Sequence, residues 1–192
     1  MNIEPAFFCP LAVDILTNID NDALKKYAVS LKSQSSGKQK SNKGGWQSED
    51  FSGYVPELNE LFVEILKRVN QLHETVGYTT KYSQGMYNAW ININSTGHYN
   101  DPHTHPKSTF SGVYYIDTQP DSGNIVFMNP QAYMIDDTDI ETHTPFLSAR
   151  RFYPPENGKL IIFPSWLMHY VERNNNSADR ISLSFNTFIN KD

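Results

Sequence analysis

From residue 86 onward the sequence consists of short segments rich in Ile, Val, Tyr and Phe, separated by clusters of Gly, Pro, Asn and Asp. Such segments are typical of β-strands, and the clusters between them are typical of turns. No helical pattern interrupts the series, so this part of the chain is predicted to form a sandwich or barrel. The predicted strand segments are 86–94, 109–118, 124–128, 159–164, 167–172 and 180–188.

Two of these segments alternate between apolar and polar residues, which predicts that each strand has one apolar and one polar face. In 180–188 the apolar set is Ile181, Leu183 and Phe185, and the polar set is Arg180, Ser182, Ser184 and Asn186. In 86–94 one face carries Asn88, Trp90, Asn92 and Asn94. One interpretation is a sheet whose polar face contacts solvent. The sharper hypothesis is that both polar faces line the interior of a barrel that holds a polar ligand.

Two amphipathic segments precede the strands and predict helices. In 20–33 and in 56–76 the apolar residues recur every three or four positions. We expect these helices to cover the apolar outer face of the sheet. The segment 32–53 between them is rich in Ser, Gly and Lys and is predicted to be a mobile surface loop. The alternative is a flap over a site, with Trp46 as its bulky anchor.

These patterns predict a single domain over residues 1–192, mainly β with N-terminal helices. Residues 1–85 are expected to form a helical flank, and residues 86–190 are expected to form the β core. The stretch 174–179 is predicted to be the turn of a hairpin that joins the last two strands.

The composition excludes several classes of protein. The formal net charge is −5, which argues against nucleic acid as the main partner. No run approaches the ~18 apolar residues needed to cross a bilayer, so no membrane association is expected. The N-terminal residues show no secretory signal, and the single cysteine, Cys9, cannot form an internal disulfide. We therefore expect a cytoplasmic protein, and the sequence is compatible with a homodimer.

The histidines indicate a candidate metal site. His103 and His105 are separated by one residue, so on an extended segment their side chains point to the same side. His169 lies in an apolar strand segment; a lone histidine there is usually a core residue, but it would supply a third imidazole. Neutral imidazole suits Zn, Cu, Fe and Ni, so three histidines do not select the ion. Two other histidines are predicted to be ordinary surface residues: His73 and His143.

Arg180 and Ser182 follow on the polar face of the last strand segment. Arg180 comes eleven residues after His169. A planar guanidinium and a hydroxyl beside a metal are suited to binding a carboxylate. The alternative is that Arg180 forms an ion pair with Asp179 or Glu172 at the edge of the sheet.

These residues resemble the iron(II)/2-oxoglutarate-dependent dioxygenases, and in particular a phage and bacterial branch that is similar to the prolyl hydroxylases. The resemblance covers about residues 86–188 and is carried by four phrases: WININ, DPHTHPKSTFSGVYYI, GKLIIFPSWLMHYVERN and DRISLSFN. A weaker similarity lies in SNKGGWQS, residues 41–48.

The resemblance implies a double-stranded β-helix, or jelly-roll, barrel flanked by helices. It implies Fe(II) as the metal, with His103, His105 and His169 as its ligands. It implies 2-oxoglutarate as the co-substrate, bound by Arg180 and Ser182, with a smaller contribution from two polar positions: Asn92 and Asn94. The enzyme would use O2 to hydroxylate an unidentified substrate and release succinate and CO2, in the host cytoplasm if a phage encodes it.

One position departs from the usual pattern of these oxygenases. Their second ligand is normally Asp or Glu, which gives two histidines and one carboxylate, whereas this chain has His105 there. With three neutral ligands and one bound carboxylate, an Fe(II) site retains a charge of about +1 instead of zero, so weaker iron retention is expected. The alternative acidic ligand is Asp101, which would reverse the usual order.

Two other hypotheses fit parts of the sequence. A cupin-type metalloenzyme is also a double-stranded β-helix, but no glutamate follows His105 at the spacing that cupins show. A non-catalytic jelly roll, such as a virion or binding module, would use the histidines structurally. The substrate is expected to be recognised by 32–53 and by the long connection 129–157, which contains an acidic run and is either a lid or a solvated excursion with a short strand. The acidic run consists of Asp136, Asp137, Asp139 and Glu141.

Overall fold

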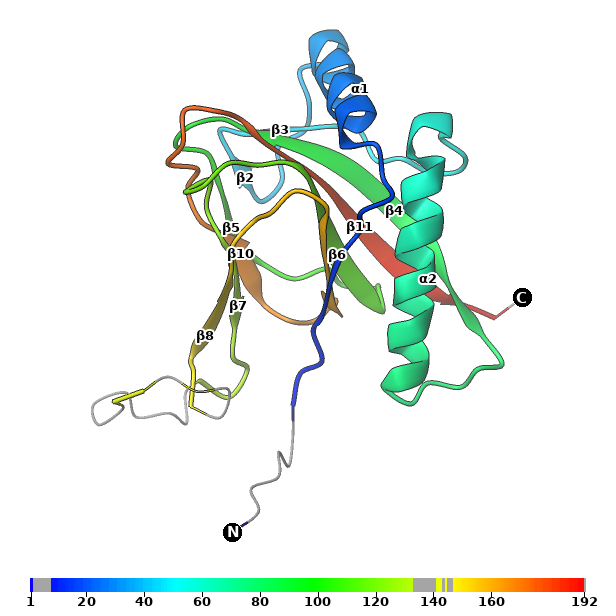
Figure 1. Cartoon of the computed structure of the whole chain (residues 1–192). Helices are drawn as coiled ribbons and strands as arrows, with labels where there is room; N and C mark the ends of the chain where they lie inside the picture. The colour runs from blue at the N-terminus through cyan, green and yellow to red at the C-terminus, as the bar shows by residue number, and fades with distance from the viewer. Residues whose placement is uncertain (2–7, 133–140, 143, 145–146, 192) are drawn as a thin grey trace.

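Two antiparallel β-sheets form the centre of the computed structural model, which describes residues 1, 8–132, 141–142, 144 and 147–191 (Figure 1). The six-stranded sheet has the order β1 (Ala12–Ile15), β9 (Lys159–Pro164), β6 (Phe110–Asp117), β11 (Arg180–Asn190), β4 (Ser83–Asn94) and β3 (Trp46–Gln47). The five-stranded sheet has the order β2 (Asn42–Lys43), β5 (Tyr99–His103), β10 (His169–Val171), β7 (Ile125–Met128) and β8 (Arg150–Tyr153). The predicted mainly β fold class is confirmed.

The helices lie against the face of the six-stranded sheet that points away from the five-stranded sheet (Figure 1). They are α1 (Asn21–Gln34), the short 3-10 helix η1 (Pro56–Leu58) and α2 (Asn59–Thr75). The Asp20 side chain caps α1 by accepting a hydrogen bond from the backbone N of Ala23 at 2.9 Å. The buried face of α2 includes Leu61, Ile65 and Val69, at the spacing of one helical stripe.

The alternation in β4 and β11 separates a large apolar core from an internal polar surface. Ile181, Leu183 and Phe185 of β11 pack into the core under the helices, together with three residues of β4: Ala89, Ile91 and Ile93. The intervening residues of both strands point to the opposite face, because side chains alternate along a strand. That face is turned toward the five-stranded sheet.

A second apolar cluster packs between the two sheets. It joins Val113 and Phe163 of the six-stranded sheet to Ile125 and Phe127 of β7. This cluster fills the part of the inter-sheet space that lies between β6, β9 and β7. The remaining part, between β4 and β11 on one side and β5 and β10 on the other, is lined by polar side chains. The inter-sheet space therefore contains an apolar region and a polar cavity.

Three local predictions differ from the structure. The stretch 174–179 is not a hairpin turn, because β10 and β11, which it joins, belong to different sheets. The segment 32–53 is not simply a surface loop, because its residues form β2 and β3 and pair with β5 and β4. His73 is not a surface residue: it is 1% exposed, and its ring nitrogens contact the side chain of Gln84 and the carbonyl of Thr79.

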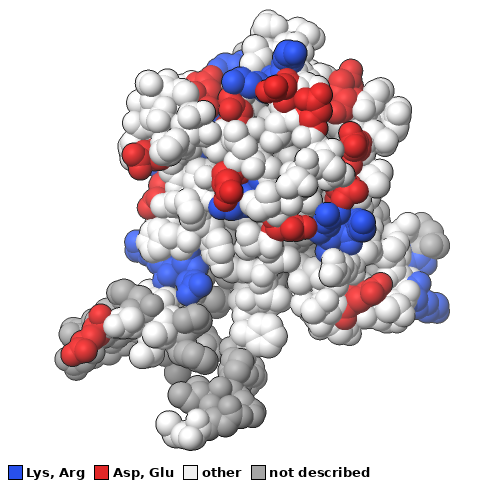
Figure 2. All heavy atoms as spheres, in the orientation of Figure 1, with Lys and Arg blue, Asp and Glu red and all other residues white. Residues whose placement is uncertain are grey.

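On the face shown in Figure 2, acidic and basic side chains are interspersed over the part of the surface that the structure describes. None of the helices described is both long and apolar enough to cross a membrane.

Candidate metal and co-substrate site

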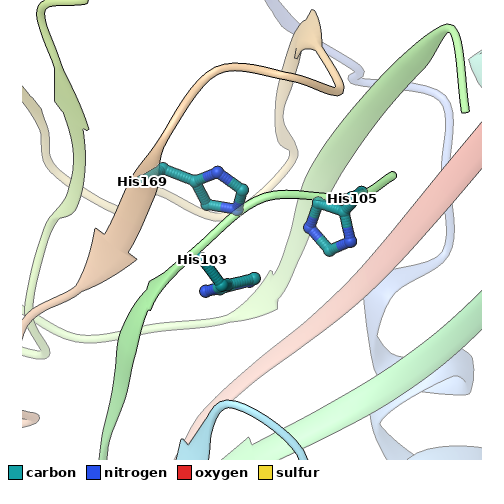
Figure 3. A group of neighbouring side chains, drawn as sticks. All are labelled: His103, His105 and His169. Atoms are coloured by element: carbon teal, nitrogen blue, oxygen red, sulfur yellow. The ribbon is translucent and has the colours of Figure 1, made fainter. Parts of the chain in front are cut away.

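Three histidines meet on the inner face of the five-stranded sheet (Figure 3). His103 ends β5 and His169 begins β10, and the antiparallel register places these two residues directly opposite each other. His105 follows His103 by two residues, just beyond the strand, and its backbone N donates to the carbonyl of Ser165 at 2.9 Å. One ligand atom from each ring lies within 4.8 Å of those from the other two. The two-residue period and the strand register together create this cluster.

Backbone hydrogen bonds orient two of the three rings. Nδ1 of His103 lies 2.7 Å from the carbonyl oxygen of Asp101, and Nδ1 of His169 lies 2.9 Å from the carbonyl oxygen of Leu167. A carbonyl can only accept, so each Nδ1 carries the proton and each Nε2 has a free lone pair. Hydrogen bonding of the second ring nitrogen is the usual way in which proteins orient metal-binding histidines.

Burial keeps these imidazoles unprotonated. It lowers the pKa of His105 to about 4, with a further contribution from the neighbouring His103. Burial also lowers the pKa of His103, and it lowers that of His169 well below the ordinary value. Neutral imidazole is the form that binds a metal ion. The cluster is therefore in its metal-binding state at neutral pH.

Asp101 does not join the histidine cluster. Its carboxylate lies 3.1 Å from Nζ of Lys43, and its side chain is 45% exposed. Its backbone contacts the site instead: the carbonyl oxygen lies against His103, and the N–H donates to the carbonyl oxygen of Ser41 at 2.9 Å. The structure thus brings His105, and not the alternative Asp101, together with His103 and His169.

The wall opposite the histidines comes from β11 and β4. Arg180 pairs with Asn94 and Ser182 with Asn92 across these two strands. All four side chains line the same cavity as the three histidines. Apart from the alternative ligand Asp101, the structure therefore brings together every residue that the sequence analysis suggested for the metal and the co-substrate.

Arg180 is a buried cation with no acidic partner among the residues that the structure describes. It is 3% exposed, and its Nη1 donates to the carbonyl oxygens of Ser122, Gly123 at 3.1 Å and Glu172 at 3.4 Å. The ion pairs of the described residues do not include Arg180, and Asp179 pairs with Lys32 instead. The predicted alternative of an ion pair with Asp179 or Glu172 is therefore wrong. A buried charge is costly unless it is paired, so this guanidinium is suited to an anionic ligand.

Sequence reasoning did not assign a role to four further residues of the cavity wall: Ser41, Trp90, Asn100 and Tyr115. Burial raises the pKa of Tyr115 to about 12, so its hydroxyl stays protonated and can donate a hydrogen bond. Tyr115 lies opposite Ser182 in the pairing of β6 with β11, which is a register that sequence alone does not give. The rings of Trp90 and His105 lie 5.7 Å apart, and Trp90 belongs to the polar face identified from the alternation.

His98, to which the sequence analysis assigned no role, is not among the residues that line this cavity. His98 lies in the turn between β4 and β5, where its Nδ1 accepts from the backbone N of Ser95 at 3.0 Å. The connection 129–157 contains the short strand β8. Four residues that the sequence analysis singled out lie outside the described part of the chain: Asp136, Asp137, Asp139 and His143.

Three clustered imidazoles on one sheet of a jelly roll and a buried guanidinium on the other could hold a metal ion and an acid, which is the chemistry of the non-haem iron oxygenases that use an oxoacid. The family model described as "Putative 2OG-Fe(II) oxygenase" matches residues 88–186, just over half of the chain, and the chain belongs to this family. Its cofactor is Fe(II), and 2-oxoglutarate and O2 are its co-substrates, as the resemblance implied. Membership favours the oxygenase hypothesis over the cupin and the non-catalytic jelly roll.

Solved structures share the fold at low sequence identity. A prolyl-4-hydroxylase from Pseudomonas putida is 13% identical, with a TM-score of 0.62 over 94% of this chain and 92% of that one. A viral collagen prolyl hydroxylase from Paramecium bursaria Chlorella virus 1, in complex with 2OG, is 11% identical, with a TM-score of 0.61 over 92% and 94% of the two chains. HygX from Streptomyces hygroscopicus, with nickel and 2-oxoglutarate bound, is 9% identical, with a TM-score of 0.62 over 94% and 83%. No curated protein matches the chain in sequence.

Proposed function

We propose that this oxygenase hydroxylates its substrate at a metal site formed by His103, His105 and His169, and that it binds 2-oxoglutarate between this site and Arg180. One observation carries the proposal: three neutral imidazoles share a cavity with a buried guanidinium that has no acidic partner among the described residues. Fe(II) and 2-oxoglutarate, when bound, supply the oxidation of a C–H bond, with consumption of O2 and release of succinate and CO2.

The orientation of two histidine rings determines which of their nitrogen atoms would bind the ion. The Nε2 atoms of His103 and His169 are the ligand atoms, because their Nδ1 atoms contact backbone carbonyls. Since His105 replaces the usual carboxylate, all three ligands are neutral and none offsets the +2 charge of the ion. The bound oxoacid must therefore provide more of the compensating charge than it does in a site with an acidic ligand.

Arg180 and Ser182 bind the far carboxylate of the co-substrate. Nη1 of Arg180 contacts three backbone carbonyls, which fix the plane of the guanidinium. The remaining N–H groups can then form charge-assisted hydrogen bonds, each worth about 1.5–3 kcal/mol. Ser182 and Tyr115, which face each other across β11 and β6, add two hydroxyl groups to this end of the cavity.

Asn92 and Asn94 complete the polar wall beside the co-substrate. The side chain of Asn92 donates to Oγ of Ser184 at 3.0 Å, and that of Asn94 donates to Oδ1 of Asn100 at 3.3 Å. These bonds hold both amides in place. Phe163 packs against the ring of His169, with ring centroids 4.6 Å apart, and shields that ligand from bulk water.

The test separates metal binding from co-substrate binding. Under anaerobic conditions, Fe(II) and 2-oxoglutarate should together give the weak metal-to-ligand charge-transfer absorption, and admission of O2 should release succinate. Single His→Ala changes at positions 103, 105 and 169 should abolish Fe(II) binding in equilibrium dialysis. Arg180→Ala should retain Fe(II) and raise the dissociation constant of 2-oxoglutarate by roughly tenfold to a hundredfold.

Thr75→Ala is a suitable control, because the Thr75 hydroxyl bonds to the carbonyl of Gln71 at the end of α2, outside the cavity, and the change should leave both affinities unchanged. Undiminished Fe(II) binding after the change at His105 would refute the ligand assignment. Undiminished 2-oxoglutarate binding after Arg180→Ala would refute the co-substrate assignment.

A further inference from the structure

Residues 38–47, which we call the strap, connect the edges of the two sheets beside the polar cavity. Within the strap, β2 pairs with β5 of the five-stranded sheet, and β3 pairs with β4 of the six-stranded sheet. Only Gly44 and Gly45 separate β2 from β3. The N-terminal half of the chain therefore closes one side of a cavity whose other residues all come from the β core.

Internal hydrogen bonds hold the strap in one conformation. The Asn42 side chain is 1% exposed; it accepts from the backbone N of Lys40 at 2.6 Å and donates to the carbonyl oxygens of Gly45 at 2.6 Å and Lys38 at 3.0 Å. Nε1 of Trp46 donates to the carbonyl oxygen of Ser35, which precedes the strap, at 2.9 Å. The strap is thus an ordered segment whose conformation is fixed by hydrogen bonds.

Two glycines allow the strap to lie close to the sheets. Gly44 has φ +79°, and a Cβ at this position would lie within 3 Å of the His98 ring. A Cβ at Gly45 would lie 2.5 Å from Oδ1 of Asn94. Larger residues at either position would push the strap away from the cavity wall.

The strap places the hydroxyl of Ser41 at the metal site. Oγ of Ser41 accepts from Nδ2 of Asn100 at 3.1 Å and lies 3.5 Å from Nε2 of His103. Ser41 and Asn100 both line the cavity that contains the histidines and Arg180. Because Asn100 donates to the serine oxygen, the serine proton is left free to point toward the site.

We propose that Ser41 donates a hydrogen bond to an oxygen atom of the oxoacid bound at the metal, and that Asn100 positions it to do so. The inference rests on the proposed function, because it takes Nε2 of His103 as a metal ligand. Once the ion occupies the lone pair of that nitrogen, the serine proton needs another acceptor, and the oxygen atoms of the co-substrate are acceptors of the required charge. The strap would thereby make co-substrate binding depend on a residue outside the β core.

The test measures Fe(II) and 2-oxoglutarate binding separately, by equilibrium dialysis and by anaerobic titration of the charge-transfer absorption. Ser41→Ala should keep the Fe(II) affinity within about twofold of the unmodified protein and raise the 2-oxoglutarate dissociation constant about tenfold. Ser41→Thr, which retains a hydroxyl, should restore most of the affinity. Asn100→Ala should produce a smaller increase, and its effect should not add to that of Ser41→Ala, because the two residues form one hydrogen-bonded unit.

Ser33→Ala is the matched control. The Ser33 hydroxyl bonds only to the carbonyl of Ser30 within α1, so both affinities should stay unchanged. If Ser41→Ala binds 2-oxoglutarate as the unmodified protein does, while His103→Ala loses Fe(II), the inference is wrong and the proposed function stands. If Ser41→Ala loses Fe(II) as well, Ser41 acts through His103 and the inference is also wrong. Absence of the charge-transfer absorption in the unmodified protein would refute the proposed function itself.

Discussion

Gly123 lies in the turn that supplies carbonyl partners to Arg180, and its replacement by alanine tests how that arginine is positioned. Its φ is +89°, in the region that residues with a Cβ avoid. A Cβ at this position would lie 2.5 Å from the carbonyl oxygen of Glu172 and 2.8 Å from Nη1 of Arg180. The first of these atoms belongs to the backbone, so the turn itself must shift.

The size of the effect follows from these contacts. The left-handed conformation costs a residue with a Cβ about 1–2 kcal/mol. Loss of one hydrogen bond to the charged guanidinium adds about 1.5–3 kcal/mol. We therefore expect Gly123→Ala to lower the free energy of unfolding by about 2.5–5 kcal/mol. Because about 1.4 kcal/mol corresponds to tenfold in affinity, the 2-oxoglutarate dissociation constant should rise roughly tenfold or more.

Gly77→Ala is the control for backbone strain. Gly77 has φ +92°, and a Cβ there would meet no heavy atom within 4 Å. This variant should lose about 1–2 kcal/mol in urea unfolding, with unchanged 2-oxoglutarate affinity in the anaerobic titration. An equal effect of both variants on 2-oxoglutarate affinity, or no effect of Gly123→Ala, would show that the carbonyl partners do not position Arg180.

Three further predictions concern the metal ligands and the core. Without 2-oxoglutarate, His105→Asp should bind Fe(II) several-fold more tightly than the uncharged His105→Asn, because it adds a negative charge to the site. Equilibrium dialysis measures both affinities, and equal binding by the two variants would contradict this. The metal-free protein should be most stable above about pH 6.5 and should lose stability as the pH falls toward 4. The reason is that burial lowers the histidine pKa values, that of His105 to about 4, so the histidines take up protons more readily in the unfolded chain. Its melting temperature across this range should change less in His105→Asn, and identical profiles would refute the explanation. Leu183→Ala, at a fully buried position under the helices, should lower the free energy of unfolding by about 2–5 kcal/mol, and a loss below 1 kcal/mol would contradict the core assignment.

The polar cavity could be predicted from sequence because its pattern is local. In β11, Ile181 and Leu183 face the helices while Arg180 and Ser182 face the cavity, and a period of two shows this separation without knowledge of the partner strands. The placement of the His103 and His105 side chains on the same side of an extended segment is equally local. The position of His169 opposite His103 depends on the register of β10 against β5, and a resemblance to known oxygenases had to supply it.

Other features depend on contacts that a local pattern does not contain. The turn-forming residues of 174–179 do not show whether the next strand pairs with the preceding strand or joins the other sheet. The polar residues of the strap resemble those of a surface loop, yet Asn42 is buried because it bonds to the backbone of the strap itself. The burial of His73, in contrast, does follow from a local pattern, because His73 lies four residues after Val69 and therefore on the buried face of α2.

The crossing of the chain between β10 and β11 has a consequence for which acids the enzyme can use. His169 stands on one sheet and Arg180 on the other, so an acid held at both ends extends from sheet to sheet. The packing of Phe127 against Phe163, one from each sheet, maintains this separation. If the acid binds as proposed, selection among oxoacids of different carbon number depends on how far apart the two sheets are held, and enlarging or trimming Phe127 or Phe163, neither of which is a proposed ligand, should alter it.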